Sequence, residues 1–329
     1  MKRVTIKDVA REAGVSIAAV SFALSGGGKL SQETRNRVIE TAARMQYIPD
    51  RIGRNLKISK TGIIGLGIVS VHGYYGQLAD AICEECRRNG YELEIFMAED
   101  GDFLLQSILG QRVDGAIILH SGFTEQNEKA LIDSEVPAVF LDREIEQSRV
   151  SSVLLDSYMA GRIAAEYLFS KGHRKILFVR GADNYDGNQR QKGFEDFMRN
   201  HGLWQQDYYI NGFFQQYVAY SEVLKFLDKG FQVPDAIFAT NDNSAFGCIA
   251  ALANAGYSVP GDISVIGCDD IEMSGWYAPA LTTVRTNISE QGVTAAKEIL
   301  RLVRGEGKGK INKIAAQIVE RATCKVREF

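Results

Sequence analysis

The sequence predicts a chain of two parts: a small, basic, all-α head and a larger α/β body built on parallel sheets. Short helical patterns fill residues 4–46, whereas apolar strand patterns alternate with helical patterns from residue 61 onward. Charge divides the chain at the same place. Residues 1–60 contain 12 cations and five anions, a net charge of +7, and the remainder, with 26 cations and 36 anions, carries −10. Such asymmetry favours contact of the head with nucleic acid, and a solvated basic surface is the alternative.

Composition narrows the class of protein. The chain has 329 residues, of which 45% are hydrophobic and 24% charged, so about two folded domains are expected and general disorder is excluded. No stretch approaches the roughly 18 apolar residues of a membrane span. The polar N-terminal segment leaves no room for an apolar export signal. We therefore expect a cytoplasmic protein that does not contact a membrane.

The cysteines give little support to metal or redox chemistry. Cys83 and Cys86 have the CxxC spacing, but they fall within a helical pattern, and no second pair completes a tetrahedral zinc site. The other three cysteines are scattered. A structural role is favoured, and we expect neither a metal nor a cofactor.

Capping residues divide the head into three helices. Thr5 and Asp8 fit a capping box at the start of the first helix, and Gly14 ends it. Ser16 can cap the second helix and Ser31 the third. The apolar residues expected to face the core are Val9, Ala10, Ala13, Val20, Leu24, Val38, Ile39, Ala42 and Met45.

The turn at residues 14–16 joins two helices within a basic segment, which fits a helix-turn-helix; a generic three-helix packing module is the alternative. In that motif the second helix enters the major groove. Ser16 and the flanking cations suit phosphate contacts. The exposed residues of the second helix are expected to be Ile17, Ala18, Ala19, Ser21 and Phe22.

The head closely resembles that of lactose-repressor-type (LacI/GalR) transcription regulators. The matching blocks are Thr5-Ile-Lys-Asp-Val-Ala-Arg-Glu-Ala-Gly-Val-Ser16, Val20-Ser21, Glu33-Thr-Arg35 and Tyr47-Ile-Pro49. The resemblance implies a homodimer that binds a near-palindromic double-stranded operator. It also implies the DNA-binding residues Thr5, Ser16, Ile17, Ala18, Ala19, Ser21, Phe22, Arg35, Arg54, Asn55 and Leu56.

One feature departs from the family pattern. Family members usually carry a hydrogen-bonding side chain, often arginine, at the place of Phe22, whereas Ile17, Ala18 and Phe22 are all apolar here. Apolar groups read the thymine methyl but cannot form bidentate bonds to guanine or adenine. We therefore expect thymine-methyl contacts and a larger share of indirect readout.

Residues 47–60 are expected to link head and body. Gly53 lies in the middle of a segment that could make barely two helical turns, so the segment alone should fray. The family resemblance implies that it becomes helical when two subunits pair on DNA, with Leu56 wedged into the minor groove. A plain flexible linker is the alternative.

Candidate strands of the body end in polar or aromatic residues. The strands are expected at 63–69, 92–97, 115–119, 138–141, 175–179, 236–239 and 263–267, with helices such as 77–88, 160–171 and 244–255 between them. Ligands of open parallel sheets bind beyond the carboxyl ends of the strands. That rule selects Tyr74, Tyr75, Asp142, Asn241, Asp242, Asp269 and Asp270.

The resemblance continues through the body, in blocks such as Gly172-His-Arg-Lys-Ile176, Asn241-Asp242 and Asp269-Asp270. It implies an N-terminal all-α helix-turn-helix head (1–46), a hinge (47–60) and an α/β sensor (61–329) like periplasmic sugar-binding proteins. The sensor would have two parallel-sheet subdomains, approximately 61–154 plus 286–312 and 155–285 plus 313–329. A small effector would bind in the cleft between them.

The resemblance also implies which residues bind the effector. Arg190, Asn241 and Asp269 match the family's hydroxyl-binding set, and such groups can hold vicinal hydroxyls by paired bonds. A sugar or sugar derivative is the expected effector, although Arg190 could equally hold a carboxylate, so a sugar acid or another small anion is the alternative. The remaining candidates are the carboxylate Asp142 and the aromatic residues Tyr74, Tyr75, Phe214 and Trp276.

Catalysis has little support, because no GxSxG elbow, P-loop or HExxH motif occurs. A solute-binding protein without regulatory action and a sugar-active enzyme are the alternative classes. We expect an effector-controlled operator-binding regulator, a repressor, that is a dimer rather than a tetramer.

Overall fold

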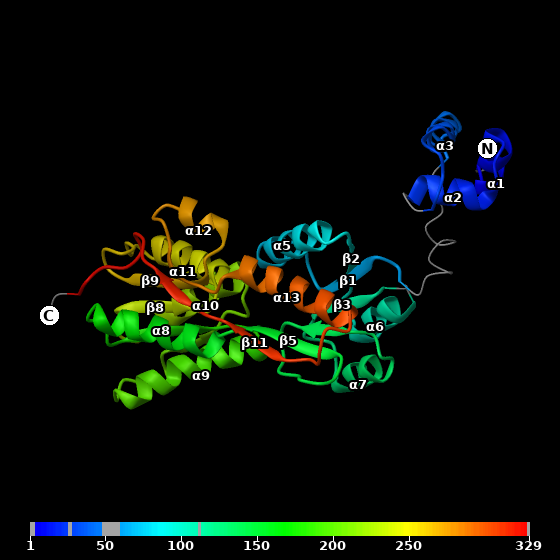
Figure 1. Cartoon of the computed structure of the whole chain (residues 1–329). Coiled ribbons are helices and arrows are strands. Elements are labelled where there is room, and N and C mark those ends of the chain that lie inside the picture. Colours follow the sequence, from blue (N-terminus) through cyan, green and yellow to red (C-terminus); the bar gives the residue numbers. More distant parts are fainter. Residues whose placement is uncertain (1–3, 26–27, 48–59, 111–112, 328–329) are drawn as a thin grey trace. The chain divides into compact units, whose positions relative to one another are not determined.

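The computed structural model describes residues 4–25, 28–47, 60–110 and 113–327. The chain forms two compact units, Met1–Thr61 and Gly62–Phe329. The described part of the first unit is all-α, and the second unit combines two sheets with helices (Figure 1). Both parts of the predicted fold class are therefore confirmed.

The head contains the helices α1 (Ile6–Ala13), α2 (Ile17–Ser25) and α3 (Gln32–Arg44) among its described residues. Asp8 Oδ2 accepts hydrogen bonds from the backbone N of Thr5 at 3.0 Å and from its Oγ1 at 2.6 Å. Gly14 ends α1 with a φ of 66°, a left-handed conformation that suits glycine. Ser16 Oγ and Ser31 Oγ accept from the third backbone N–H that follows each of them. The predicted caps are confirmed.

A small apolar core holds the three head helices together. Val9, Val20 and Val38, one from each helix, are fully buried in it. The prediction for Ile39 is wrong: its side chain is 45% exposed, and Thr41 is buried instead. Positions 38, 41, 42 and 45 lie on one helical face at three- and four-residue spacing, and residue 39 is turned about 100° away from 38.

The body contains two six-stranded sheets. The first has the order β11-β5-β4-β3-β1-β2 and the second the order β12-β10-β9-β8-β6-β7. All neighbours are parallel except β10 and β12. The strands are β1 (Ile63–Ile68), β2 (Glu92–Met97), β3 (Gly115–Leu119), β4 (Ala138–Phe140), β5 (Val150–Leu155), β6 (Ile176–Arg180), β7 (Tyr209–Asn211), β8 (Ala236–Ala239), β9 (Ser264–Asp269), β10 (Thr282–Arg285), β11 (Ile311–Ile314) and β12 (Gln317–Val319).

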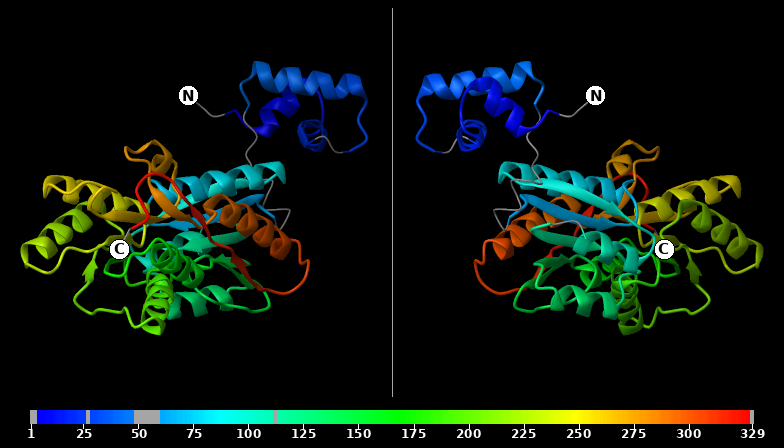
Figure 2. Two further views of the ribbon diagram at one scale, coloured as in Figure 1. Left: turned by 90° about the vertical axis from the view of Figure 1, so that its left-hand side faces the viewer. Right: turned by 90° about the vertical axis from the view of Figure 1, so that its right-hand side faces the viewer.

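Helices cover both faces of each sheet (Figure 2). On the first sheet, α5 (Tyr74–Arg88) and α13 (Ile288–Val303) pack on one face, and α6 (Gly101–Gly110) and α7 (Glu125–Asp133) pack on the other. On the second sheet, α10 (Gln216–Asp228) and α11 (Asp242–Asn254) pack on one face, and α8 (Ser157–Ser170) and α9 (Tyr185–Asn200) pack on the other. The short helix α12 (Glu272–Trp276) follows β9.

The chain passes between the two sheets at three crossovers, residues 155–157, 285–288 and 314–317. Because α13 and β11 return to the first sheet, that subdomain is discontinuous in sequence. The predicted subdomain boundaries at 154/155 and 285/286 lie at the first two crossovers. The predicted boundary at 312/313 falls within β11, so Lys313 and Ile314 belong to the first subdomain. Five strands of the two sheets were not predicted from the sequence: β5, β7, β10, β11 and β12. Two of them, β7 and β12, have three residues each.

Close contact between α8 and α9 positions part of the cleft. A Cβ atom at Gly161 would lie 1.9 Å from the carbonyl O of Arg190, and one at Gly193 would lie 1.9 Å from that of Tyr158. Only glycine permits this approach, so the pair of glycines sets where α9 presents Arg190.

Asp242, at the start of α11, joins three segments of the second subdomain. Its fully buried carboxylate accepts from Thr283 Oγ1 at 2.5 Å, from Ser274 Oγ at 2.6 Å and from the backbone N of Ile271 at 3.0 Å. Burial, followed by the nearby charge of Asp269, raises the pKa of Asp242 to about 7. The carboxylate thus links α11, α12 and β10 beside the carboxyl end of β9.

Replacing Asp242 by alanine should therefore destabilise the protein. The substitution leaves buried donors of Ile271, Ser274 and Thr283 without their acceptor, and we expect a loss of about 2–4 kcal/mol in the free energy of unfolding. Chemical denaturation of the full chain measures this loss. The control is Asp228→Ala at an exposed position at the end of α10, which should change stability by less than about 0.5 kcal/mol. Equal effects of the two substitutions would contradict the linking role of Asp242.

Candidate DNA-binding head and effector cleft

The exposed side of α2 is apolar, as the sequence predicts. Ile17 is 45% and Phe22 47% exposed, and Ala18 and Ser21 are exposed as well, whereas Ala19 is half-buried. Residues 17–22 begin at the N-terminal end of α2, where helix-turn-helix proteins contact base edges. This surface offers apolar groups and one hydroxyl to DNA.

Two other predicted DNA-binding residues, Arg35 and Thr5, lie outside α2 and make hydrogen bonds within the head. Arg35 lies on α3, and its Nη1 donates to the carbonyl oxygens of Phe22 at 3.3 Å and Ala23 at 3.2 Å, at the last turn of α2. A cation is favourable at a helix C-terminus. Thr5 caps α1. Arg54, Asn55 and Leu56 lie outside the described residues.

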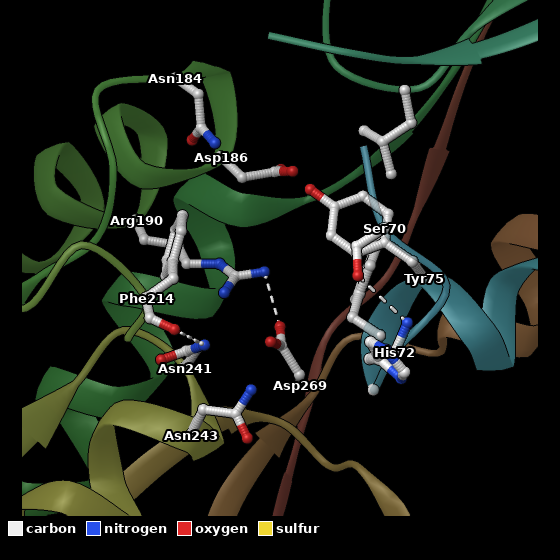
Figure 3. Close-up of a pocket in the computed structure, with 13 residues that line it drawn as sticks. Ser70, His72, Tyr75, Asn184, Asp186, Arg190, Phe214, Asn241, Asn243 and Asp269 are labelled. Atoms are coloured by element: carbon white, nitrogen blue, oxygen red, sulfur yellow. Dashed lines mark hydrogen bonds and ion pairs between the residues drawn. The ribbon is translucent and has the colours of Figure 1, made fainter. Parts of the chain in front are cut away.

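The body contains a cavity of about 440 Å³ at the carboxyl ends of six strands, which come from both sheets (Figure 3). Six of the eight predicted effector residues line it. The six are Tyr74, Tyr75, Arg190, Phe214, Asn241 and Asp269. The strand-end rule therefore locates the cavity.

An ion pair between buried groups lies in this cavity. Arg190 Nη2 is 2.8 Å from Asp269 Oδ1, and their side chains are only 3% and 9% exposed. Arg190 Nη1 also donates to the carbonyl O of Thr240 at 2.6 Å. Burial raises the pKa of Asp269 to about 6, although the adjacent Arg190 charge opposes the rise. Each charge therefore compensates the other in a site that excludes much of the solvent.

Phe214 and Asn241 form one wall. The ring of Phe214 lies 5.8 Å from the Arg190 guanidinium carbon, and it occupies the space that a side chain at Gly181 would fill, 2.2 Å from the Cβ position. Asn241 Nδ2 donates to the carbonyl O of Phe214 at 3.1 Å, and its Oδ1 accepts from the backbone N of Ser244 at 2.9 Å, which caps α11. These two hydrogen bonds fix the Asn241 side chain and tie it to the backbone of Phe214.

Two tyrosines at the start of α5 form the facing wall. Tyr74 donates its hydroxyl to Gln291 Oε1 at 2.6 Å, and Gln291 Nε2 in turn donates to the carbonyl O of Val153 at 2.9 Å. Burial raises the pKa of Tyr74 well above its usual value. Burial and the charges of Asp142 and Asp186 raise the pKa of Tyr75. Both hydroxyls are therefore neutral donors or acceptors at physiological pH.

Several lining residues were not predicted. Asp186, in the first turn of α9, accepts from Ser157 Oγ at 2.6 Å, and burial raises its pKa. The strand-end rule, applied to the loops after β1 and β6, would have found most of this set. The set comprises Ser70, His72, Gly73, Leu119, Asn184, Asp186 and Asn243.

Two predicted residues do not line the cavity. Asp142 follows β4 as expected, but its carboxylate is bound by the next residue: Arg143 Nε is 2.9 Å from Oδ1 and Nη2 is 3.1 Å from Oδ2. Trp276 ends α12, is 80% exposed and lines a separate groove with residues of α5 and α13. Trp276 lies on α12, and residues of this helix line that groove and not the cavity.

The described part of the chain gives little support to metal binding or to thiol chemistry. Its His, Cys, Asp and Glu side chains form no group of three or more that could hold a metal ion. Burial raises the pKa of Cys86 to about 12, which disfavours the thiolate that metal binding and redox chemistry require. No described helix is both long and apolar enough to cross a membrane.

Known proteins resemble the chain in both units. Residues 5–50 match the family of bacterial regulatory proteins described as the lacI family, and residues 165–324 match the periplasmic binding protein-like domain. The HTH-type transcriptional repressor PurR of Histophilus somni (strain 129Pt) is 30% identical, over 98% of this chain and 99% of its own length. Catabolite control protein A of Priestia megaterium is 30% identical, over 92% and 93%.

Solved structures agree with these relatives. The lac repressor dimer bound to operator and the anti-inducer ONPF has a TM-score of 0.87 at 27% identity, and covers 98% of this chain and 100% of its own. A LacI-family regulator from Enterococcus faecium with bound ribose has a TM-score of 0.73 at 25% identity, over 81% and 100%. These relatives are transcriptional regulators, not enzymes. The chain belongs to the LacI/GalR family and is a DNA-binding transcriptional repressor.

Proposed function

We propose that an uncharged, hydroxyl-rich small molecule, a sugar or sugar derivative, binds in the cleft and controls the operator affinity of this repressor. The Arg190–Asp269 ion pair is the observation that carries the proposal. An arginine with no anionic partner would favour a carboxylate or phosphate ligand. Here the guanidinium charge is already matched within the cleft.

The charges of the lining also oppose an anionic effector. Asp186 adds a second carboxylate to that of Asp269, and Arg190 is the single Lys or Arg side chain among the lining residues. A sugar acid would have to displace Asp269 from Arg190 and then face both carboxylates. Of the two alternatives that the sequence left open, this favours the neutral ligand.

The remaining groups suit hydroxyls. Asn184, Asn243 and Ser70 bring amide and hydroxyl donors and acceptors to the cavity wall. The Phe214 and Tyr75 rings offer apolar faces to the CH surface of a sugar ring. A volume of about 440 Å³ is typical of small-molecule sites. The ribose bound to the Enterococcus faecium relative supports the same class of ligand.

The coupling to DNA is proposed through the hinge, residues 47–60. If the effector changes the relation of the two subdomains, paired hinge segments gain or lose their contact with each other and with DNA at once. We propose that Arg54, Asn55 and Leu56 act there, that the protein works as a homodimer on a near-palindromic operator, and that it acts in the cytoplasm, where such operators lie. The lac repressor dimer on its operator supports this arrangement.

We expect thermal shift to separate neutral sugars from their acids. Galactose, glucose and ribose derivatives would be tested on the full chain, each hexose beside its uronic acid. A ligand at about 100 times its dissociation constant stabilises a protein by roughly 2.7 kcal/mol. A neutral sugar should raise the melting temperature, and the matching uronate should not.

Two variants sharpen this test. Asp186→Asn should reduce the discrimination against uronates, because it removes one of the two carboxylates of the lining. Asp183→Asn is the control: Asp183 lies in the loop just before α9, its side chain is 79% exposed, and it pairs with Arg180 at 3.2 Å. Stabilisation by uronates alone, with neutral sugars inactive, would reject the proposed ligand class.

We expect Ile17→Ala to weaken operator binding about ten-fold, because it removes an apolar contact with bases worth on the order of 1–2 kcal/mol. Ile39→Ala is a matched control, since Ile39 has the same type and the same 45% exposure on α3. The operator would first be selected from random duplexes, and affinities then measured by fluorescence anisotropy. Equal losses for both variants, or a guanine-rich half-site at the contacted positions, would contradict apolar readout by α2.

A further inference from the structure

A hydrogen bond joins the two subdomains beside the effector cleft. The hydroxyl of Tyr185 donates to Glu144 Oε1 at 2.7 Å. Tyr185 is the first residue of α9, which packs on the second sheet, whereas Glu144 follows β4 of the first sheet. The bond therefore spans the two subdomains, which the three crossovers link covalently and between which Ile271 packs against the cores of both.

Each partner of this hydrogen bond is fixed within its own subdomain. Tyr185 lies between Asn184 and Asp186, which line the cavity. Glu144 is held on the first subdomain by Lys313 of β11, whose Nζ is 3.0 Å from Oε1. Movement of α9 around a bound ligand would therefore act directly on the bond to Glu144.

The chemistry of the pair favours a strong bond. Burial and the hydrogen bond to Glu144 raise the pKa of Tyr185, so the hydroxyl keeps its proton. The hydrogen bonds from Tyr185 and Lys313 lower the pKa of Glu144, so the acceptor stays charged. A hydrogen bond to a charged acceptor contributes more than one between neutral groups.

We propose that Tyr185 and Glu144 form a latch that stabilises this arrangement of the two subdomains and so sets how readily the cleft opens to an effector. They are positioning residues that need not touch the ligand. The bond forms only where the two bodies lie in the right relation, so it biases the hinge equilibrium toward that state. The latch does not depend on which effector binds.

The competing interpretation is a surface bond without consequence. The side chain of Glu144 is 46% exposed, and exposed polar pairs often contribute little. The structure offers a matched control for this possibility. Tyr158 of α8 donates to Asp196 Oδ2 of α9 at 3.0 Å, so a similar tyrosine–carboxylate bond lies within a single subdomain.

Hydrogen–deuterium exchange of the full chain without ligand tests the latch. Tyr185→Phe should increase exchange about three- to ten-fold at residues 143–147, at residues 184–188 and at the three crossovers, because the bodies separate more often. Glu144→Ala should give the same pattern, and the double variant should add nothing further. Tyr158→Phe should change exchange within α8 and α9 alone.

Three results would overturn the proposal. Exchange at the crossovers and at residues 143–147 could be unchanged in Tyr185→Phe. The control Tyr158→Phe could produce the same pattern at those places. The effects of Tyr185→Phe and Glu144→Ala could add independently. Melting temperatures of all variants identify any that fail to fold. If Tyr185→Phe fails to fold, Glu144→Ala, at a half-exposed loop position, still tests the latch.

Discussion

The ion pair between Arg190 and Asp269 is the interaction on which the effector cleft depends. Two charges removed from water are tolerated only with close partners, and loss of either one leaves an uncompensated charge that costs about 3–5 kcal/mol. The surrounding structure meets this demand. The Thr240 carbonyl accepts a second guanidinium bond, and the glycine contact between α8 and α9 brings Arg190 to its place. The pair also sets the charge that a ligand meets, and the proposal of a neutral effector rests on it.

The cleft lies between the two subdomains and is lined by residues of both. Tyr74 and Tyr75 belong to the first subdomain, whereas Arg190, Asn241 and Asp269 belong to the second. A ligand that touches both walls favours the arrangement in which both are in reach, and it shifts the equilibrium only by its difference in affinity for the two states. The latch between Tyr185 and Glu144 acts on the same equilibrium without the ligand. In this account, DNA affinity responds to whatever changes the relation of the two bodies.

Much of this could be predicted from the sequence, because capping and strand-end rules depend on local pattern. Thr5, Gly14, Ser16 and Ser31 end or begin helices as expected, and the ends of the recognised strands located the cavity. Two of the five strands that were not predicted, β5 and β10, contain buried hydroxyl residues whose partners are remote in sequence: Ser151 donates to Glu298 and Thr283 to Asp242. Tertiary contacts also decided the cases of Asp142, which Arg143 binds, and Trp276, which a short helix carries away from the cleft. No local pattern reveals such partners.

Thermodynamic reciprocity between the two sites tests the central claim most directly. The sugar that stabilises the protein would be titrated into the full chain with and without operator, and operator would be titrated with and without the sugar. If the cleft and the head are coupled, the two ligands must change each other's dissociation constant by the same factor, typically about 5–150-fold. An effector dissociation constant that is identical in the presence and absence of operator would contradict the account.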